Sequence, residues 1–253
     1  MMETLLGFAI AVMVGLTGVG GGSLTVPILI LTFGMPAASA VGTSLLFVTA
    51  CKLVAGPMYL VRRQVNARAL LFLLAGGVPG ALAGSFILRA VRSRSLEPVV
   101  LTVVGSVIAV MALMNLCRHV RNRRGRPVSD RQRRLPWVAF PIGLETGFSS
   151  AGAGALGSMA LMCLTPLSAS EIVGTDLLFG LAVSAVGGSF HAATGNLNAG
   201  LLAKLCLGGI PGAALGAWLG GWLPSRQLRA ALNLFLAFLG GQLLWMGVLK
   251  LVR

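Results

Sequence analysis

Long apolar segments fill most of this 253-residue chain, and they constrain its fold more than any other feature. Hydrophobic residues make up 56% of the sequence and charged residues only 10%, and the mean hydropathy is +0.90. These values lie outside the range of ordinary soluble domains. A helix needs about 20 apolar residues to cross the hydrocarbon layer, where every backbone polar group must be paired within the segment. We therefore predict an all-α integral membrane protein.

The apolar segments fall into two groups of four, which predicts about eight transmembrane segments. They cover residues 5–33, 39–60, 69–90, 97–117, 136–165, 170–193, 200–223 and 227–251. A basic stretch separates the groups. The sequence thus predicts a first transmembrane repeat at 1–117, a linker at 118–134 and a second transmembrane repeat at 135–253.

The linker, "RHVRNRRGRPVSDRQRR", is rich in arginine and contains one acid, Asp130. Positive charge gathers on the cytoplasmic side of membrane proteins, against anionic lipid, so we expect a cytoplasmic linker. With four crossings in each group, both chain termini would share that side. The net charge of +14 lies mostly in loops, so no nucleic-acid partner is expected. In this layout some arginines fall on the opposite side, against the rule: Arg89, Arg92, Arg94, Arg226 and Arg229.

The two groups of segments are copies of one another. "VGTSLLF" at residues 41–47 returns 132 positions later as "VGTDLLF" at 173–179, with Asp176 in place of Ser44. "GGVPGALAG" at 76–84 likewise returns as "GGIPGAALG" at 208–216. Duplicated halves recur in secondary transporters, where they move about a site placed between them. Whether the two halves are parallel or inverted stays open at this point.

A glycine-rich run interrupts the first segment of each half. "GLTGVGGGSLTVP" at 15–27 and "GFSSAGAGALGSM" at 147–159 occupy equivalent places. Glycine costs about 1 kcal/mol relative to alanine inside a helix, so these runs favour a break. A broken helix exposes N–H groups that can hold an anion. Close helix packing is the alternative interpretation, and it suits the spacing of "GGVPGALAG" and its twin better.

Charged residues inside membrane segments are costly, so they usually face a cavity or a partner. Asp176 is the one charged difference between the twin heptapeptides, and we assign it to coupling with protons or another ion, with His191 as a second coupling residue. A paired structural acid and a polar anchor are the respective alternatives. Lys52 would attract an anionic substrate or balance an acid. Glu145 and Glu171 lie nearer segment ends, where snorkelling or capping explains them.

The predicted substrate site combines the glycine runs, the Gly-Thr pairs and Lys52. We expect the two Gly-Thr pairs to form opposite walls of a single site. No cofactor and no metal are expected, because the four cysteines lack the spacing of metal ligands. The candidate substrate-binding residues are Gly20, Gly21, Gly22, Ser23, Thr43, Ser44, Lys52, Gly152, Gly154 and Thr175.

An ordered set of motifs resembles the TauE/SafE sulfite-exporter family across residues 15–223. The motifs are "GVGGGSLTVP", "GTSLLF", "GTDLLF", a histidine about fifteen residues later in "GGSFHAATGNLN", and "GGIPGAALGAWL". The resemblance implies secondary transport of a small anion, such as sulfite, a sulfonate or sulfoacetate, across the lipid bilayer of a bacterial inner membrane. Asn198 departs from the family pattern, which often has an acid at that place, so a coupling role there is in doubt.

Other classes of function stay open beside the transporter. A passive anion channel or a membrane-embedded binding protein would share the same composition, and the oligomeric state is left open. "GFSS" and His191 also supply the parts of an intramembrane serine hydrolase. The duplication argues against an enzyme, because Thr17 and Gly18 stand where the second half has Ser149 and Ser150.

Overall fold

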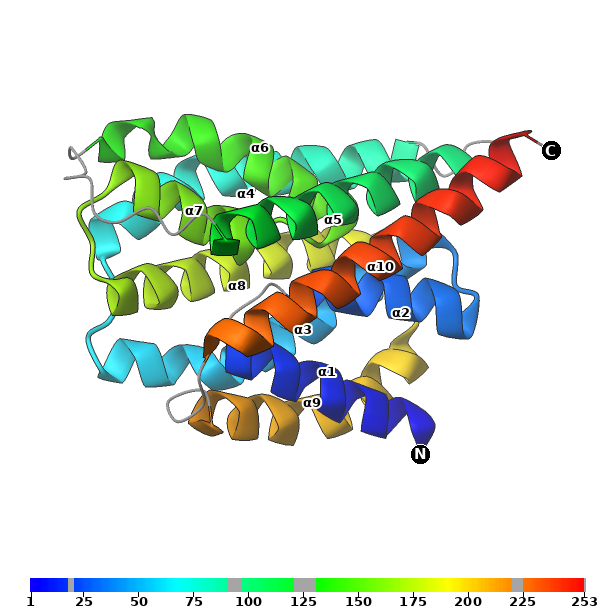
Figure 1. Cartoon of the computed structure of the whole chain (residues 1–253), viewed down its shortest axis with the longest axis horizontal. Coiled ribbons are helices and arrows are strands. Elements are labelled where there is room, and N and C mark those ends of the chain that lie inside the picture. The colour runs from blue at the N-terminus through cyan, green and yellow to red at the C-terminus, as the bar shows by residue number, and fades with distance from the viewer. Residues whose placement is uncertain (18–20, 91–96, 121–130, 220–224, 253) are drawn as a thin grey trace.

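A computed structural model of the chain describes residues 1–17, 21–90, 97–120, 131–219 and 225–252. Within these ranges the chain forms ten α-helices and no β-strand, which confirms the all-α prediction (Figure 1). The first half contains α1 (Met2–Thr17), α2 (Gly21–Phe33), α3 (Ala37–Val61), α4 (Ala67–Ala90) and α5 (Glu97–Val120). The second half contains the 3₁₀ turn η2 (Gln132–Arg134), α6 (Leu135–Ser149), α7 (Ala155–Leu164), α8 (Ala169–Ala193), α9 (Ala199–Leu219) and α10 (Ser225–Val252).

Four helices of the described ranges are long and apolar enough to cross a membrane. They are Ala37–Val61, Ala67–Ala90, Ser170–Ala193 and Ala199–Leu219. Large apolar side chains on α4 and α9, such as Leu71, Leu207 and Trp218, are exposed on the outside of the bundle. Exposed apolar surface of this kind fits a lipid surrounding. The chain is a multi-pass membrane protein.

The glycine-rich runs break the helices where the sequence predicts. Ser150 (φ 66°) and Gly154 (φ 120°) adopt left-handed backbone conformations between α6 and α7, which stop one helix and allow another to start. In the first half α1 ends at Thr17 and α2 begins at Gly21. The predicted segments 5–33 and 136–165 are therefore two helices each.

Each broken segment turns back on itself. The N–H of Arg131, just before η2 and α6, donates a hydrogen bond to the carbonyl of Leu164 at the end of α7, at 2.9 Å. The end of α7 thus lies beside the start of α6, and the two helices form a hairpin. Figure 1 shows α2 likewise running back towards the side of the N-terminus. The described residues of the glycine-rich runs lie where α1 ends and α2 begins, and where α6 ends and α7 begins.

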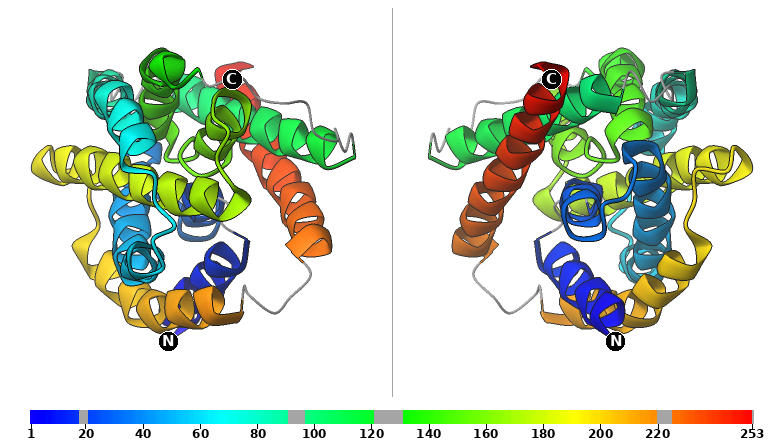
Figure 2. Two further views of the ribbon diagram at one scale, coloured as in Figure 1. Left: turned by 90° about the vertical axis from the view of Figure 1, so that its left-hand side faces the viewer. Right: turned by 90° about the vertical axis from the view of Figure 1, so that its right-hand side faces the viewer.

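The first helix of each hairpin packs against the other half of the chain. α6 lies along α4, and α1 lies along α9, as the pairs at the top and bottom of Figure 2 show. Glycines allow the close approach, because an added Cβ would overlap the backbone opposite. The packing role predicted for "GGVPGALAG" and "GGIPGAALG" is thus confirmed. The matching contacts are Gly76–Pro136, Gly80–Phe140 and Gly84–Leu144 in one pair, and Gly208–Thr4, Gly212–Phe8 and Gly216–Val12 in the other.

Contacts between α3 and α8 are antiparallel. Gly42 near the start of α3 lies against the carbonyl of Asn196 beyond the end of α8, and Gly174 near the start of α8 lies against the carbonyl of Gln64 beyond the end of α3. These contacts are again 132 positions apart. α5 and α10 also run in opposite directions, since Gly247 near the end of α10 meets the start of α5.

The described course of the chain separates its termini from the start of α6. The N- and C-terminal ends lie at one end of the molecule, while α5 ends and α6 begins at the other (Figure 1). The prediction had placed the linker and both termini together. The difference arises because the predicted segments 5–33 and 136–165 each turn back as a pair of helices instead of running straight. Linker residues 121–130 lie outside the described residues.

Candidate functional site

The repeated Gly-Thr pairs join the two halves. The Thr43 hydroxyl accepts a hydrogen bond from the backbone N–H of Asn198 at 3.1 Å, and the Thr175 hydroxyl accepts one from the N–H of Asn66 at 3.0 Å. Each asparagine side chain in turn accepts a backbone N–H in the first turn of the helix that follows it. Both threonines are buried. Because α3 and α8 are antiparallel, the two pairs lie at opposite ends of the helix pair and do not form facing walls of one site.

Lys52 lies in the middle of the α3 and α8 crossing. Its side chain is only 7% exposed, and its Nζ lies where a Cβ of Gly180 would otherwise be, with Ala153 of the α6–α7 tip beside it. In the described ranges no carboxylate oxygen is within 4 Å of this ammonium. Asp176 stands four residues before Gly180, on the same face of α8. A buried cation from the first half thus lies near a buried acid from the second.

The carboxylate of Asp176 lies at the beginning of α7. The side chain is 3% exposed, and its Oδ2 accepts a hydrogen bond from the hydroxyl of Ser158 at 2.5 Å. The same carboxylate lies against Gly157 in the first turn of α7, where an added Cβ would overlap its Oδ1. Its Oδ1 is buried without a hydrogen-bond partner among the described residues. The N-terminal turn of α7, with its partial positive charge, therefore faces an acid supplied by the protein itself.

The equivalent place in the first half carries no charge. Ser44 stands where the second half has Asp176, and its hydroxyl lies 3.2 Å from that of Ser150, at the tip of the other hairpin. Gly22, at the start of α2, lies against the same Ser150. Val26 takes the place of Ser158. The start of α2 thus lacks the internal carboxylate that the start of α7 has.

The other candidate residues of the glycine runs divide between the two hairpins. Gly21 and Ser23 are buried in the first turn of α2, whereas Gly20 lies outside the described residues. Gly152 lies against the carboxylate of Glu145 and leaves room for it. Gly154 is the residue that precedes α7. The structure thus gathers the described members of the runs at the two hairpin tips.

Glu145 corrects an interpretation made from the sequence. It lies one turn before the tip of the α6–α7 hairpin, inside the molecule. One carboxylate oxygen accepts a hydrogen bond from Ser149, and Oε2 is buried with no partner among the described residues. The first half has Met13 at the position equivalent to Glu145, which is a second charged difference between the halves. This difference was the signal in the sequence that could have identified Glu145. Glu171, by contrast, forms a capping box with Ser168, as capping predicted.

His191 lies apart from Asp176. The two are 15 residues apart on α8, which corresponds to about 22 Å along a helix. Its ring is fully buried, and its Nε2 donates a hydrogen bond to the carbonyl of Gly147 at 3.1 Å. Ser149 donates to Glu145, so the structure does not bring Ser149 and His191 together as the dyad of a hydrolase.

Comparison with known proteins gives this geometry its context. The family model described as Sulfite exporter TauE/SafE matches residues 4–243, nearly the whole chain. The chain belongs to the TauE/SafE family. It is 29% identical over 234 residues to the probable membrane transporter protein YjnA of Bacillus subtilis, covering 89% of this chain and 92% of that protein. It is 26% identical over 250 residues to YdhB of the same organism, also a probable membrane transporter protein, covering 97% of this chain and all of YdhB.

A third relative matches a smaller part. It is a probable membrane transporter protein of Haemophilus influenzae, 27% identical over 157 residues, which are 58% of this chain and 56% of that protein. The resemblance seen in the sequence motifs is confirmed, and the TauE/SafE chain is a membrane transporter. The buried charged residues described above, Lys52, Asp176 and Glu145, thus form the candidate site of this transporter.

Proposed function

We propose that this TauE/SafE protein is a secondary transporter that moves a small anion across the bacterial inner membrane, coupled to protons or another ion. Sulfite, a sulfonate and sulfoacetate are the substrates of first choice. One observation carries the proposal: Lys52 of the first half lies against Gly180, one helical turn along α8 from Asp176 of the second half, and both charged side chains are buried. Buried charges in membrane proteins mark substrate and ion pathways.

The architecture we propose is a pair of inverted repeats. Each half would comprise one hairpin that turns back within the membrane and three helices that cross it. Contacts that recur 132 positions apart, such as Thr43–Asn198 and Thr175–Asn66, support a two-fold relation between the halves. Inverted repeats let a transporter expose one central site alternately to each side.

The anion site we propose lies at the start of α2. In the second half the Asp176 carboxylate occupies the start of the corresponding helix, α7. In the first half the neutral Ser44 supplies no carboxylate, and an anion from outside the protein would take that role, beside the hydroxyl of Ser150. Lys52 follows Ser44 by about two turns of α3 and would supply the opposite charge, while the serine hydroxyl and helix N–H groups donate hydrogen bonds.

Coupling follows from competition for Lys52. An ionised Asp176 attracts the ammonium, whereas a protonated Asp176 leaves its charge to the anion. Proton and anion would then favour each other's binding, and this coupling is reciprocal. Net movement of the anion would therefore respond to an imposed pH gradient.

The proposed orientation puts the basic end of the molecule in the cytoplasm. Arg62 and Arg63 after α3, Arg68 on α4, and Arg131 to Arg134 before α6 all lie at the end where α3 stops and α4 and α6 begin. Arg226 and Arg229, in the first turns of α10, now join that end, so the positive-inside rule is obeyed better than in the eight-segment layout. Reporters fused at residues 121–130 and at the C-terminus should report opposite sides of the membrane. Two cytoplasmic reporters would contradict this topology.

Flux measurements in proteoliposomes test the function directly. Sulfite, thiosulfate, sulfonates and carboxylates would each be offered with and without a pH gradient, and Lys52→Met would serve as the control that removes the buried cation. We expect one class of anion to accumulate only when the gradient is present. Gradient-independent flux would instead indicate a passive anion channel, and no flux of any of these anions would contradict the proposed substrate class.

A further inference from the structure

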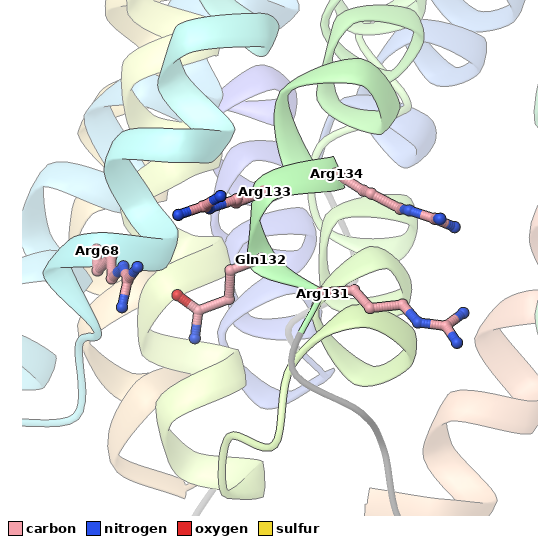
Figure 3. Close-up of a pocket in the computed structure, with 5 residues that line it drawn as sticks. All are labelled: Arg68, Arg131, Gln132, Arg133 and Arg134. Atoms are coloured by element: carbon pink, nitrogen blue, oxygen red, sulfur yellow. The ribbon is translucent and has the colours of Figure 1, made fainter.

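A second cationic site lies outside the transport centre, at the basic end of the molecule. A cavity of about 210 Å³ opens between the start of α4 and η2, lined by Arg68, Arg131, Gln132, Arg133 and Arg134. In Figure 3 Arg68 and Arg133 lie on the same side of η2, with Gln132 between them, while Arg131 and Arg134 extend to its other side. Two segments from different halves of the chain thus contribute arginines to one cavity, and the side chains of Arg68 and Arg133 lie on the same side of η2.

These arginines have no acidic partner in the described ranges. No carboxylate oxygen lies within 4 Å of any of the four guanidinium groups there, and Asp130 of the linker lies outside the described residues. Neighbouring cations repel one another, so an anion between them is favoured. A planar guanidinium can donate two parallel hydrogen bonds to two oxygens of one phosphate group. The cavity is therefore suited to an anion that bears a phosphate group.

An exposed apolar surface begins directly beside the arginines. Leu71, three residues after Arg68 on α4, is 67% exposed, and Trp137, three residues after Arg134 on α6, is 83% exposed. α4 and α6 run parallel from this end, in contact through glycines. Tryptophan next to a basic band is typical of the boundary between lipid headgroups and acyl chains. A ligand that fits both surfaces has an anionic head and an apolar tail.

We propose that the cavity binds the phosphate group of an anionic phospholipid, with the acyl chains along α4 and α6. The site joins α4 of the first half to η2 and α6 of the second. A lipid bound there bridges the halves at their most extensive contact, and it stabilises the folded transporter by mass action. This site is independent of the transport centre and of the substrate proposed for it.

Lipid binding to the purified, delipidated full-length protein tests this proposal. The probes are phosphatidylglycerol, phosphatidylcholine and inorganic phosphate, followed by native mass spectrometry and by the thermal unfolding midpoint in detergent. We expect phosphatidylglycerol to bind and to raise the midpoint, and phosphatidylcholine to do neither. Removing two arginines in Arg68→Gln/Arg133→Gln should weaken phosphatidylglycerol binding by roughly 25-fold, at about fivefold for each cation near an anionic lipid.

Arg89→Gln is the matched control, because Arg89 is an exposed arginine on the same helix at the other end, and it should leave binding unchanged. Equal binding of phosphatidylcholine and phosphatidylglycerol would overturn the proposal, as would unchanged binding by the double variant. Inorganic phosphate that raises the midpoint as much as the lipid does would assign the cavity to a soluble anion. The comparison among the three probes uses the unaltered protein, so it decides the matter even where the double variant does not fold.

Discussion

The two halves of this transporter share their scaffold and differ in their charges. Thr43 and Thr175 make the same hydrogen bond to the other half, and the glycines of α4 and α9 make the same helix contacts. The buried charges have no counterpart. Asp176 replaces Ser44, Lys52 stands opposite Ser184 in the alignment, and Glu145 replaces Met13.

This contrast explains why one heptapeptide is charged and its twin is not. Residues that occur in both halves hold the halves together, so a change in one copy would lose a contact that the other still makes. Residues that differ between the halves make the two helix starts unequal. A carboxylate already occupies the start of α7, whereas the start of α2 has none. We therefore expect substitutions in the shared set to affect stability and substitutions in the differing set to affect transport.

The largest effect should come from making the halves alike. Ser44→Asp would put a carboxylate at the start of α2, where we place the substrate anion. Like charges brought together cost several kcal/mol, so transport should fall by about 100-fold or more. Initial rates of anion flux in proteoliposomes measure it. Ser44→Asn, of similar size and neutral, is the control and should keep most of the rate. Wild-type flux in Ser44→Asp would rule out an anion site at this helix end.

A smaller effect should follow from crowding Lys52. Gly180→Ala adds a Cβ where the Lys52 ammonium lies, and the flexible side chain can move aside, so we expect the protein to fold. Displacement of the ammonium from the centre should reduce the transport rate about tenfold, because transport depends on where the charge is held. Gly241→Ala on α10, where an added Cβ meets no atom within 4 Å, is the matched control. Equal rates in the two variants would argue against a role for the position of Lys52.

The smallest effect on transport should come from the shared threonines. Thr43→Val and Thr175→Val each leave one backbone N–H without its acceptor, which costs on the order of 1–3 kcal/mol. Thermal unfolding in detergent should show similar losses for the two variants, and the folded protein should still transport. Loss of transport with an unchanged unfolding midpoint, in either variant, would return the Gly-Thr pairs to the substrate site that the sequence first suggested.

Much of the scaffold could be predicted because it depends on local preferences. The glycine-rich runs at 15–27 and 147–159 disfavour helix, so the breaks before α2 and α7 could be predicted from composition. The spacing of the glycines in α4 and α9 indicates a packing face by itself. Family membership also followed from motifs in their order, without knowledge of any contact.

The parts that the sequence did not predict depend on contacts between distant residues. A glycine run indicates that a helix breaks but not that the chain turns back, which is fixed by packing such as that of Arg131 on Leu164. The hairpins within the predicted segments 5–33 and 136–165 were not predicted for this reason. Asn66 and Asn198 could be recognised in the sequence as a repeated residue, but not as the partners of Thr175 and Thr43. Glu145 was assigned to a segment end because its segment was interpreted as a single helix.

The most direct test of the account is the loss of coupling in Asp176→Asn. This change keeps the size and hydrogen-bonding capacity of the side chain but removes its titration. We predict that anion exchange between the two sides of a proteoliposome persists, while accumulation driven by a pH gradient is lost. The double variant Lys52→Met/Asp176→Asn controls for a purely structural pair, because it should rescue folding if the acid served only to balance the lysine. Accumulation by Asp176→Asn that still follows the imposed pH gradient would contradict the coupling role of Asp176.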